Sequence, residues 1–197
     1  SLLYSEPESK IQEQLTNRIK LIPLVDEDNR LIDIADALKG HKVPVLEPEL
    51  AGNELAYVTD CVKTSWISSQ GKYVKEFENI FSRIHEGYHA VAVSNGTVAL
   101  QLSLEALGIK EGDEVIVPDL TFIASVNAII HVGAKPVLCE IEKDTWNIDP
   151  SEAEKLITDK TKAIMPVHLY GLPCNMEKIL HLAKKHKLLI IEDAAES

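Results

Sequence analysis

The sequence predicts an α/β fold with a mainly parallel sheet and helices on both of its faces. Between residues 89 and 191, short apolar runs of strand length alternate with longer segments of helical periodicity. Such alternation is typical of parallel strands that are connected and covered by helices. A glycine-bearing turn follows the first of these strands, and polar or aromatic residues follow two later ones. Ligands of such folds bind where the strands end, so a site is expected at this carboxyl edge.

The first 42 residues are expected to form a separate, smaller unit. We predict a short helix at residues 10–17, strands at 21–25 and 31–34 around a turn at 26–29, and a helix that starts at residue 34 and is stopped by Gly40. Residues 41–49, HKVPVLEPE, contain two prolines and are predicted to be an extended crossover. The larger domain is expected to cover residues 43–197.

Two amphipathic helices and a hydroxyl-rich loop open the larger domain. Apolar residues form one helical stripe in residues 53–63, and in residues 73–84 they are predicted to face inward at Val74, Phe77, Phe81 and Ile84. The loop SWISSQG at 65–71 lies between these helices. Its Trp66 either anchors the loop to the core or, with Ser68 and Ser69, contacts a sugar or a nucleotide, and both interpretations stay open.

The chain is organised around residues 89–107, HAVAVSNGTVALQLSLEAL. Residues 89–93 have the length of a buried strand, and residues 98–107 are predicted to form a helix with Val98, Leu102 and Ala106 on one face. In the turn between them, Gly96 lets a ligand approach the backbone, and the free N–H groups of the following helix point toward that ligand. This is the arrangement of a phosphate site, and equally of an ordinary helix start with Ser or Thr as its cap.

The remaining elements follow in alternating order. Strands are predicted at residues 114–117, 137–141, 161–167 and 188–191, and helices at 123–131, from 150 onward and at 176–185. Asp149, Pro150 and Glu152 together form a helix start, and Asn175 is the predicted cap of the last helix.

Three of the strand ends carry residues that favour a cofactor site: the turn at 94–97, Thr121 with Phe122, and residues 193–196. A phosphate turn, an aromatic ring and an acid would together hold a phosphorylated, protonated heteroaromatic cofactor, and pyridoxal 5'-phosphate has these features. A partly buried carboxylate such as Asp193 keeps the pyridine nitrogen protonated, because it opposes the positive charge in a low dielectric. Taken singly, Phe122 reads as core and Asp193 as a helix cap, but their convergence at one edge favours the cofactor.

Composition and charge indicate a globular protein that does not bind nucleic acid. The 197 residues are 45 % hydrophobic, enough to bury a core, and the net charge of −11, with no basic block, argues against a nucleic-acid partner. The sequence has no apolar run of membrane length and no signal peptide, so we expect a cytoplasmic protein with no membrane contact. Its cysteines and histidines lack metal-ligand spacing, so we expect no metal site. Cys61, Cys139 and Cys174 are predicted to be buried free thiols.

The order helix, strand, turn, strand, helix around IPLVDEDNRLIDI at residues 22–34 resembles the closing half of a CBS module. Such modules work as pairs that bind adenine nucleotides, so the resemblance implies an adenine nucleotide as a ligand of this partial segment. A plain hairpin packed on the next domain explains the same pattern.

Residues 43–197 resemble the N-terminal half of the DegT/DnrJ/EryC1/StrS family of sugar aminotransferases. The matching motifs are SNGTVAL at 94–100, GDEVIVPDLTFIASVNAI at 112–129, VGAKPV at 132–137, TKAIMPVHLYGLPCNM at 161–176 and IIEDAAES at 190–197. The resemblance implies the large domain of a fold type I transferase that depends on pyridoxal phosphate. Residues 64–78 are most similar to the branch that aminates C4 of a GDP-4-keto-6-deoxymannose with glutamate, the perosamine type of polysaccharide and O-antigen biosynthesis.

The resemblance also implies roles for individual residues. Gly96 and Thr97 would bind the cofactor phosphate, Phe122 would stack on the pyridine ring, and Asp193 would pair with the ring nitrogen. Glu196 stands where many relatives have Gln or His in contact with the ring hydroxyl, so a carboxylate there needs that hydroxyl protonated or makes a different contact. His168 lies at a strand end near the site, and a structural role is favoured for it.

Other implications of the resemblance concern the whole protein. The family's Schiff-base lysine is expected beyond the last motif, which implies that this chain is a fragment that does not transaminate by itself. Relatives are homodimers, so a homodimer is implied. Two alternatives remain: a deoxysugar dehydratase of the same family, with His in place of that lysine, and a non-catalytic nucleotide-sensing module linked to the CBS-like segment.

Overall fold

A computed structural model describes residues 2–3, 5–15, 21–36 and 49–197 of the chain. The chain divides into two compact units, Ser1–Ile67 and Ser68–Ser197. The predicted domain boundary at residue 42 lies outside the described residues and stays a prediction.

The first unit contains a small sheet and a helix packed on it. Strand β2 (Leu21–Val25) is central, with β1 (Leu2–Leu3) parallel to it and β3 (Leu31–Asp36) antiparallel. Helix α1 (Glu8–Gln14) contributes the buried Ile11 to a core formed with Ile22, Leu24 and Ala35. Asp26 closes the turn between β2 and β3, because its Oδ1 accepts the N–H of Arg30 at 2.8 Å.

The predicted hairpin at residues 21–34 is confirmed, and it belongs to this sheet and not to the sheet of the second unit. The predicted helix start at Ile34 is wrong. Strand β3 continues to Asp36, because Ile34 pairs with Pro23 and Ala35 pairs with Ile22. The rest of that expected helix, residues 37–38, lies outside the described residues.

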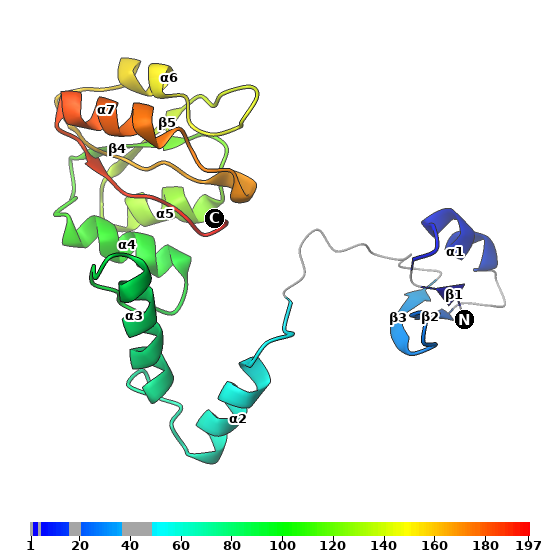
Figure 1. Cartoon of the computed structure of the whole chain (residues 1–197). Coiled ribbons are helices and arrows are strands. Elements are labelled where there is room, and N and C mark those ends of the chain that lie inside the picture. The colour runs from blue at the N-terminus through cyan, green and yellow to red at the C-terminus, as the bar shows by residue number, and fades with distance from the viewer. Residues whose placement is uncertain (1, 4, 16–20, 37–48) are drawn as a thin grey trace. The chain divides into compact units, whose positions relative to one another are not determined.

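The second unit is built on four parallel strands in the order β5-β4-β6-β7. These strands are β4 (Glu114–Pro118), β5 (Lys135–Cys139), β6 (Thr161–Ile164) and β7 (Leu189–Ile190). Helices α4 (Gly96–Ala106) and α5 (Ile123–His131) cover one face, and α6 (Pro150–Lys155) and α7 (Met176–His186) cover the other (Figure 1). The predicted α/β fold with helices on both faces is confirmed.

Two cores lie on the two faces of this sheet, because successive residues of a strand point to opposite sides. Val115 and Val117 of β4 pack in one core with α4 and α5, while Ile116 packs in the other with α6 and α7. The helix caps on the second face are as predicted. Asp149 Oδ1 accepts the N–H of Ser151 at 2.8 Å, and Asn175 Oδ1 accepts the N–H of Lys178 at 3.2 Å.

Helix α4 does not bury the face that carries Val98 and Leu102. Leu100 and Leu104 lie in the core, whereas Val98 and Leu102 are 39 % and 42 % exposed. The sequence GTVALQLSLEA is apolar on several sides, so periodicity alone did not distinguish them. Packing on the sheet selects the two leucines, which lie four residues apart on one side of the helix.

Residues 89–93 do not form the predicted strand. The N–H of Ala92 donates instead to Oε1 of Glu78, a residue of α3 (Lys72–Ile84), at 2.9 Å. A strand requires a hydrogen-bonded neighbour, and the sheet formed by the described residues ends at β5 and β7.

Helices α2 (Glu54–Lys63) and α3, which belong to different units, both expose their apolar residues. Phe77 is 55 % and Ile84 is 69 % exposed, so the prediction that this stripe of α3 faces inward is wrong. An amphipathic stripe is buried only where another element covers it, and no residue of α3 is buried within the described residues. No helix in the described part of the chain is long and apolar enough to cross a bilayer.

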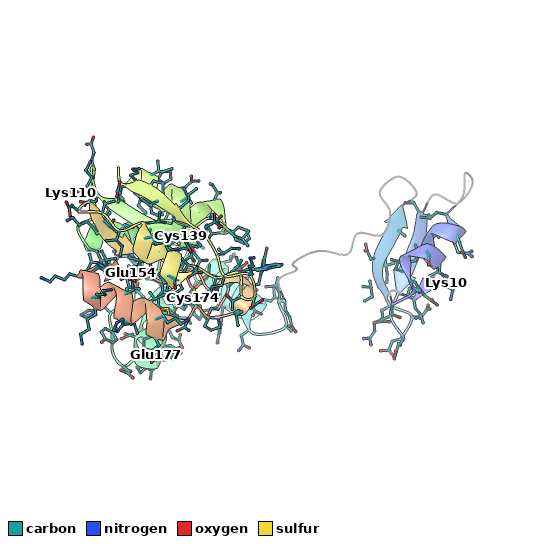
Figure 2. The ribbon with its side chains drawn as sticks, turned by 90° about the horizontal axis from the view of Figure 1, so that it is seen from above. Lys10, Lys110, Cys139, Glu154, Cys174 and Glu177 are labelled. Atoms are coloured by element: carbon teal, nitrogen blue, oxygen red, sulfur yellow. The ribbon has the colours of Figure 1, made fainter. Side chains whose placement is uncertain are left out.

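The three cysteines are free, as predicted, but they differ in burial. Cys139 and Cys174 are buried in the second unit (Figure 2), while Cys61 on α2 is only half-buried. Burial disfavours the charged thiolate, and it raises the pKa of Cys139 to about 12 and the pKa of Cys174 to about 11.

Candidate active site at the carboxyl edge of the sheet

The candidate site begins where β4 and β7 end. After β4 the chain turns through Thr121 and Phe122 into α5. After β7 it continues to Asp193, which forms a parallel bridge with Val167 beyond the end of β6. Since these strands are parallel, both turns lie at the carboxyl edge of the sheet.

A chain of hydroxyl hydrogen bonds joins the two turns. Asp193 is 6 % exposed, and its Oδ2 accepts a hydrogen bond from Oγ of the fully buried Ser125 at 2.7 Å. The same hydroxyl lies 2.9 Å from Oγ1 of Thr121. Asp193 Oδ1 accepts the N–H of Ala195 at 3.2 Å. The orientation of the Asp193 carboxylate is therefore fixed by two donors, Ser125 and Ala195, that lie far apart from each other in the sequence.

Ser125 was not singled out from the sequence, although a signal was present. It lies in the mainly apolar helical segment IASVNAIIH, one turn after Thr121. A hydroxyl on the buried face of a helix requires a partner, and Asp193 is that partner.

Phe122 lies directly before α5, with its backbone extended. Its side chain is 64 % exposed, so the reading of Phe122 as a core residue is wrong. A large exposed ring near a buried carboxylate is a surface on which a flat ligand can pack.

The start of α4 lies at the same edge. The short connection at residues 107–113 joins the end of α4 to the start of β4, so α4 runs antiparallel to that strand. The helix has 11 residues and β4 has 5, which corresponds to roughly 16 Å for each. Gly96, at the other end of α4, is therefore level with the end of β4.

The cap of α4 is Asn95, whose Oδ1 accepts the N–H of Val98 at 3.0 Å, and not Ser or Thr. Gly96 has no positive φ, so its backbone does not demand glycine. A Cβ built on it would have no atom within 4 Å, so space is open at this helix start. Together with the free N–H groups of the first turn, this space can accept an anion.

Glu196 and His168 are both engaged by backbone groups. Glu196 Oε2 accepts the N–H of Tyr170 at 2.6 Å, a contact that the sequence did not predict. His168 Nδ1 accepts the N–H of Cys174 at 3.1 Å, so the proton lies on Nε2, which is 3.1 Å from Glu192 Oε2. His168 is 5 % exposed and holds the turn after β6 in place, which is a structural role.

The predicted substrate contacts Trp66, Ser68 and Ser69 fall on the two sides of the unit boundary. Trp66 is 58 % exposed in the first unit, and Ser68 Oγ accepts the N–H of Gln70 at 3.3 Å at the start of the second. Their role in substrate binding remains a prediction.

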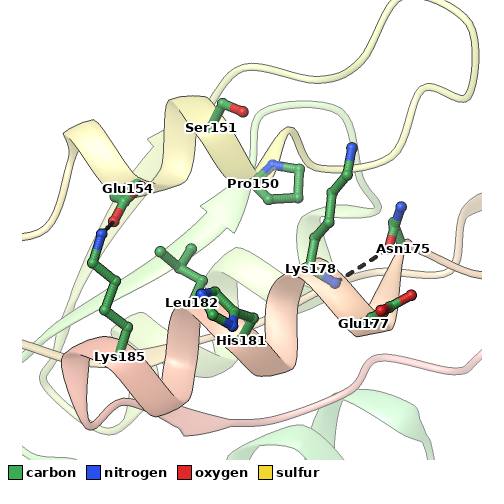
Figure 3. A pocket seen from close by; sticks show the side chains of 9 residues that line it. All are labelled: Pro150, Ser151, Glu154, Asn175, Glu177, Lys178, His181, Leu182 and Lys185. Atoms are coloured by element: carbon green, nitrogen blue, oxygen red, sulfur yellow. Dashed lines mark hydrogen bonds and ion pairs between the residues drawn. The ribbon is translucent and has the colours of Figure 1, made fainter.

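A separate hollow of about 530 Å³ lies between α6 and α7 (Figure 3). Within it Lys185 forms an ion pair with Glu154 at 2.7 Å. These helices cover the sheet face opposite to α4 and α5, and none of the predicted site residues lines the hollow. Among the described residues, no group of three or more His, Cys, Asp or Glu side chains could hold a metal ion.

Comparison with known proteins identifies the family. The sequence model described as the DegT/DnrJ/EryC1/StrS aminotransferase family matches residues 48–197. The chain belongs to this family. A curated relative in it, GDP-perosamine synthase of Escherichia coli O157:H7, is 55 % identical over 155 residues, which are 79 % of this chain and 43 % of the relative. The chain thus spans less than half the length of this relative.

Solved structures of other proteins also resemble this chain. NtdA of Bacillus subtilis, with bound cofactor PMP, is 39 % identical with a TM-score of 0.67, over 71 % of this chain and 32 % of NtdA. A GDP-4-keto-6-deoxymannose-3-dehydratase with a trapped PLP–glutamate adduct is 30 % identical with a TM-score of 0.69, over 77 % of this chain and 41 % of the dehydratase. The fold type I architecture is thereby confirmed. The family match begins at residue 48, so the CBS-like interpretation of residues 1–42 stays a prediction.

Proposed function

We propose that this chain is part of a pyridoxal-phosphate-dependent aminotransferase that acts on a nucleotide-linked 4-keto-6-deoxy sugar with glutamate as the amino donor. The observation that carries this proposal is the buried carboxylate of Asp193, held by Ser125 next to the turn that presents the exposed ring of Phe122. The 55 % identity to a GDP-perosamine synthase supports the substrate class.

The residues at the carboxyl edge fit the cofactor at three points. The open space at Gly96 suits a phosphate that approaches the backbone, with Thr97 as a further hydrogen-bond donor. The exposed ring of Phe122 suits the face of a pyridine. Within the described part of the chain, each oxygen of Asp193 has one donor, from Ser125 or Ala195, and retains a lone pair for a protonated ring nitrogen.

When bound, pyridoxal phosphate supplies a sink for the electron pair left on a substrate carbon that loses its proton. Asp193 would keep the proton on the pyridine nitrogen, since a buried carboxylate favours the positive charge. Phe122 would pack on the ring and exclude water from it. We assign the proton-transferring lysine to none of the lysines in the described residues.

Glu196 has a double task in this proposal. Its Oε2 accepts the N–H of Tyr170 and so fixes the turn after β6, which leaves Oε1 for a protonated ring hydroxyl of the cofactor. The proposal also includes Trp66, Ser68 and Ser69 as substrate contacts, a cytoplasmic homodimer, and a place in polysaccharide or O-antigen biosynthesis. The homodimer and the biosynthetic role follow from the family resemblance, and the cytoplasmic location follows from the composition of the sequence.

The alternatives have weaker support. The identity of 30 % to a dehydratase is lower than the 55 % to a GDP-perosamine synthase, which favours amino transfer over dehydration. A non-catalytic nucleotide sensor would rest on the CBS-like residues 1–42 alone, and these lie outside the matched segment.

Titration with pyridoxamine 5'-phosphate, which needs no lysine, tests the cofactor site of this chain. Thr97→Ala should weaken binding roughly tenfold or more, since a hydrogen bond to a charged group is worth about 1.5–3 kcal/mol. Asp193→Asn should change the absorbance spectrum of the bound cofactor, because a neutral amide no longer holds the ring nitrogen protonated. Glu154→Gln, on the other face of the sheet, is the matched control. An unchanged spectrum in Asp193→Asn would remove Asp193 from the site.

Amino transfer itself can be tested in a chimera that continues residues 48–197 with the remainder of the Escherichia coli relative. With glutamate and GDP-4-keto-6-deoxymannose it should form the 4-amino sugar, and Asp193→Asn should abolish most of that turnover. A chimera that binds the cofactor but forms no amino sugar would contradict the proposed amino transfer.

A further inference from the structure

Two exposed aromatic side chains meet beside the candidate site. Trp146 and Tyr170 are 52 % and 70 % exposed, and their ring centroids lie 6.4 Å apart with an interplanar angle of 70°. Trp146 lies in the loop between β5 and α6, and Tyr170 lies in the turn after β6. Their edge-to-face contact forms a corner with apolar ring faces open to solvent, which we call the aromatic corner.

Both residues of the aromatic corner have an unusual backbone conformation. Their φ angles are positive, 61° for Trp146 and 52° for Tyr170, although neither is glycine. This left-handed conformation costs an ordinary side chain conformational energy, so it persists only where the surroundings impose it, and such positions cluster at functional sites.

Hydrogen bonds hold Trp146 and Tyr170 in this left-handed backbone conformation. The N–H of Trp146 donates to the carbonyl of Glu142 at 2.9 Å, and the N–H of Tyr170 donates to Glu196 Oε2 at 2.6 Å. The buried Asn147 joins the two loops: its Nδ2 donates to the carbonyl of Leu172 at 3.0 Å, and its Oδ1 accepts the N–H of Leu169 at 3.3 Å. The two rings are therefore presented by a preformed frame.

That frame is connected directly to the candidate site. Glu196, which holds Tyr170, follows Asp193 by three residues, and the carbonyl of Asp193 accepts the N–H of His168 at 3.0 Å. On the proposed function, the part of the substrate that reacts at this site is the hexose with its keto carbon. The reacting hexose therefore lies beside the aromatic corner.

The charges around the aromatic corner favour an uncharged ring over a diphosphate. The carboxylate of Glu196 lies at Tyr170. The carboxylate of Glu142 accepts the hydroxyl of Thr145 next to Trp146, in a loop that also carries Lys143 and Asp144, so the acids outnumber the lysine. Negative side chains repel phosphate, whereas the C–H face of a deoxyhexose is apolar and packs on aromatic rings. We propose that Trp146 and Tyr170 bind the hexose ring of the nucleotide sugar. This inference rests on the proposed function and adds residues that determine its specificity.

Tryptophan fluorescence of the full 197-residue chain tests the proposal. The chain contains two tryptophans, so Trp66 is kept in every variant, and the part of the response that disappears in Trp146→Phe is assigned to Trp146. GDP-mannose should quench or shift the emission saturably, while GDP at equal concentration should leave it unchanged. Tyr170→Ala should raise the apparent Kd for GDP-mannose at least tenfold. Tyr170→Phe, which keeps the ring, should stay within twofold, as should Tyr88→Ala at an exposed tyrosine outside the aromatic corner.

Three results would overturn the assignment. The first is no saturable change in emission with GDP-mannose. The second is an equal change with GDP alone, which would indicate binding of the base or the diphosphate. The third is a Tyr170→Ala variant whose Kd for GDP-mannose stays within twofold. If Tyr170→Ala loses its far-UV circular dichroism, the Tyr170→Phe and GDP results decide. A chain that binds pyridoxamine phosphate but gives any of these results keeps the proposed function and loses the aromatic corner. A chain that binds GDP-mannose but no pyridoxamine phosphate loses the proposed function instead.

Discussion

Two buried carboxylates lie at opposite edges of the parallel sheet and are held in different ways. At the carboxyl edge, Asp193 has a neutral hydroxyl and a backbone N–H as donors. At the amino edge, Glu114 is 7 % exposed and binds Thr158 Oγ1 at 2.7 Å and Lys135 Nζ at 3.0 Å. The acid at the amino edge is paired with a cation, as suits a structural role, whereas the acid at the carboxyl edge has no cation in contact among the described residues and can pair with a cationic ring.

Ser125→Ala should destabilise the second unit by about 1–3 kcal/mol, because it leaves the buried Asp193 without its hydroxyl donor. Urea denaturation followed by circular dichroism measures this loss. Ser151→Ala, at an exposed position in α6, is the control and should change stability by less than about 0.5 kcal/mol. Equal stabilities of the two variants would contradict the part given to Ser125.

Glu114 should make stability depend on pH. The hydrogen bond from Thr158, followed by that from Lys135, holds the pKa of this carboxyl below its usual value. Its contribution is therefore fully present above the unfolded pKa of about 4.3 and is lost as the pH falls through the lowered folded value. Glu114→Gln should cost about 1–3 kcal/mol at pH 7, and its difference from the parent should shrink below about pH 4. A difference that is constant from pH 7 to pH 3, or equal to that of the exposed Glu76→Gln, would speak against this account.

At the scale of elements, the sequence predicted what depends on local signals. The bounds of α5 and the caps Asp149 and Asn175 follow from periodicity and from side chains that bind nearby N–H groups, and all of them are confirmed. Two predictions were wrong: that residues 89–93 form a strand, and that the apolar stripe of α3 faces inward. Both features depend on a tertiary neighbour that a local pattern does not reveal.

The same distinction applies to the candidate site. Phe122 and Asp193 could be predicted because they follow strands, and Gly96 because it opens a helix, and both are local signals. The partner of Asp193, Ser125, is 68 residues away, and Tyr170 is 26 residues from Glu196. No spacing in the sequence indicates such contacts, so they required the folded structure.

A pair of leucines in α4 tests which of its faces packs on the sheet. Leu104→Ala should cost about 2–5 kcal/mol, because Leu104 is fully buried between α5 and the sheet. Leu102→Ala should cost less than about 1 kcal/mol, since that side chain is 42 % exposed. Chemical denaturation of both variants is the measurement, and a reversed order would show that the face with Val98 and Leu102 packs on the sheet.

At the scale of the whole molecule, the two units have separate cores and should unfold as separate cooperative units. Leu24→Ala removes a fully buried side chain from the small core of the first unit. Differential scanning calorimetry should show one transition lowered and the transition of the second unit unchanged. A common shift of all heat absorption would show that the chain unfolds as one cooperative body.

The burial of Cys139 and Cys174 has a consequence for labelling chemistry. The thiolate is the species that alkylating reagents attack, and thiols with a pKa of about 12 and about 11 are almost entirely protonated at neutral pH. Cys61, which is half-buried on α2, is the remaining thiol. A maleimide dye should therefore react at one position of the folded chain, on the first unit. The native sequence thus provides a single attachment point for measurements of distance and rotation, with the second unit left chemically unmodified.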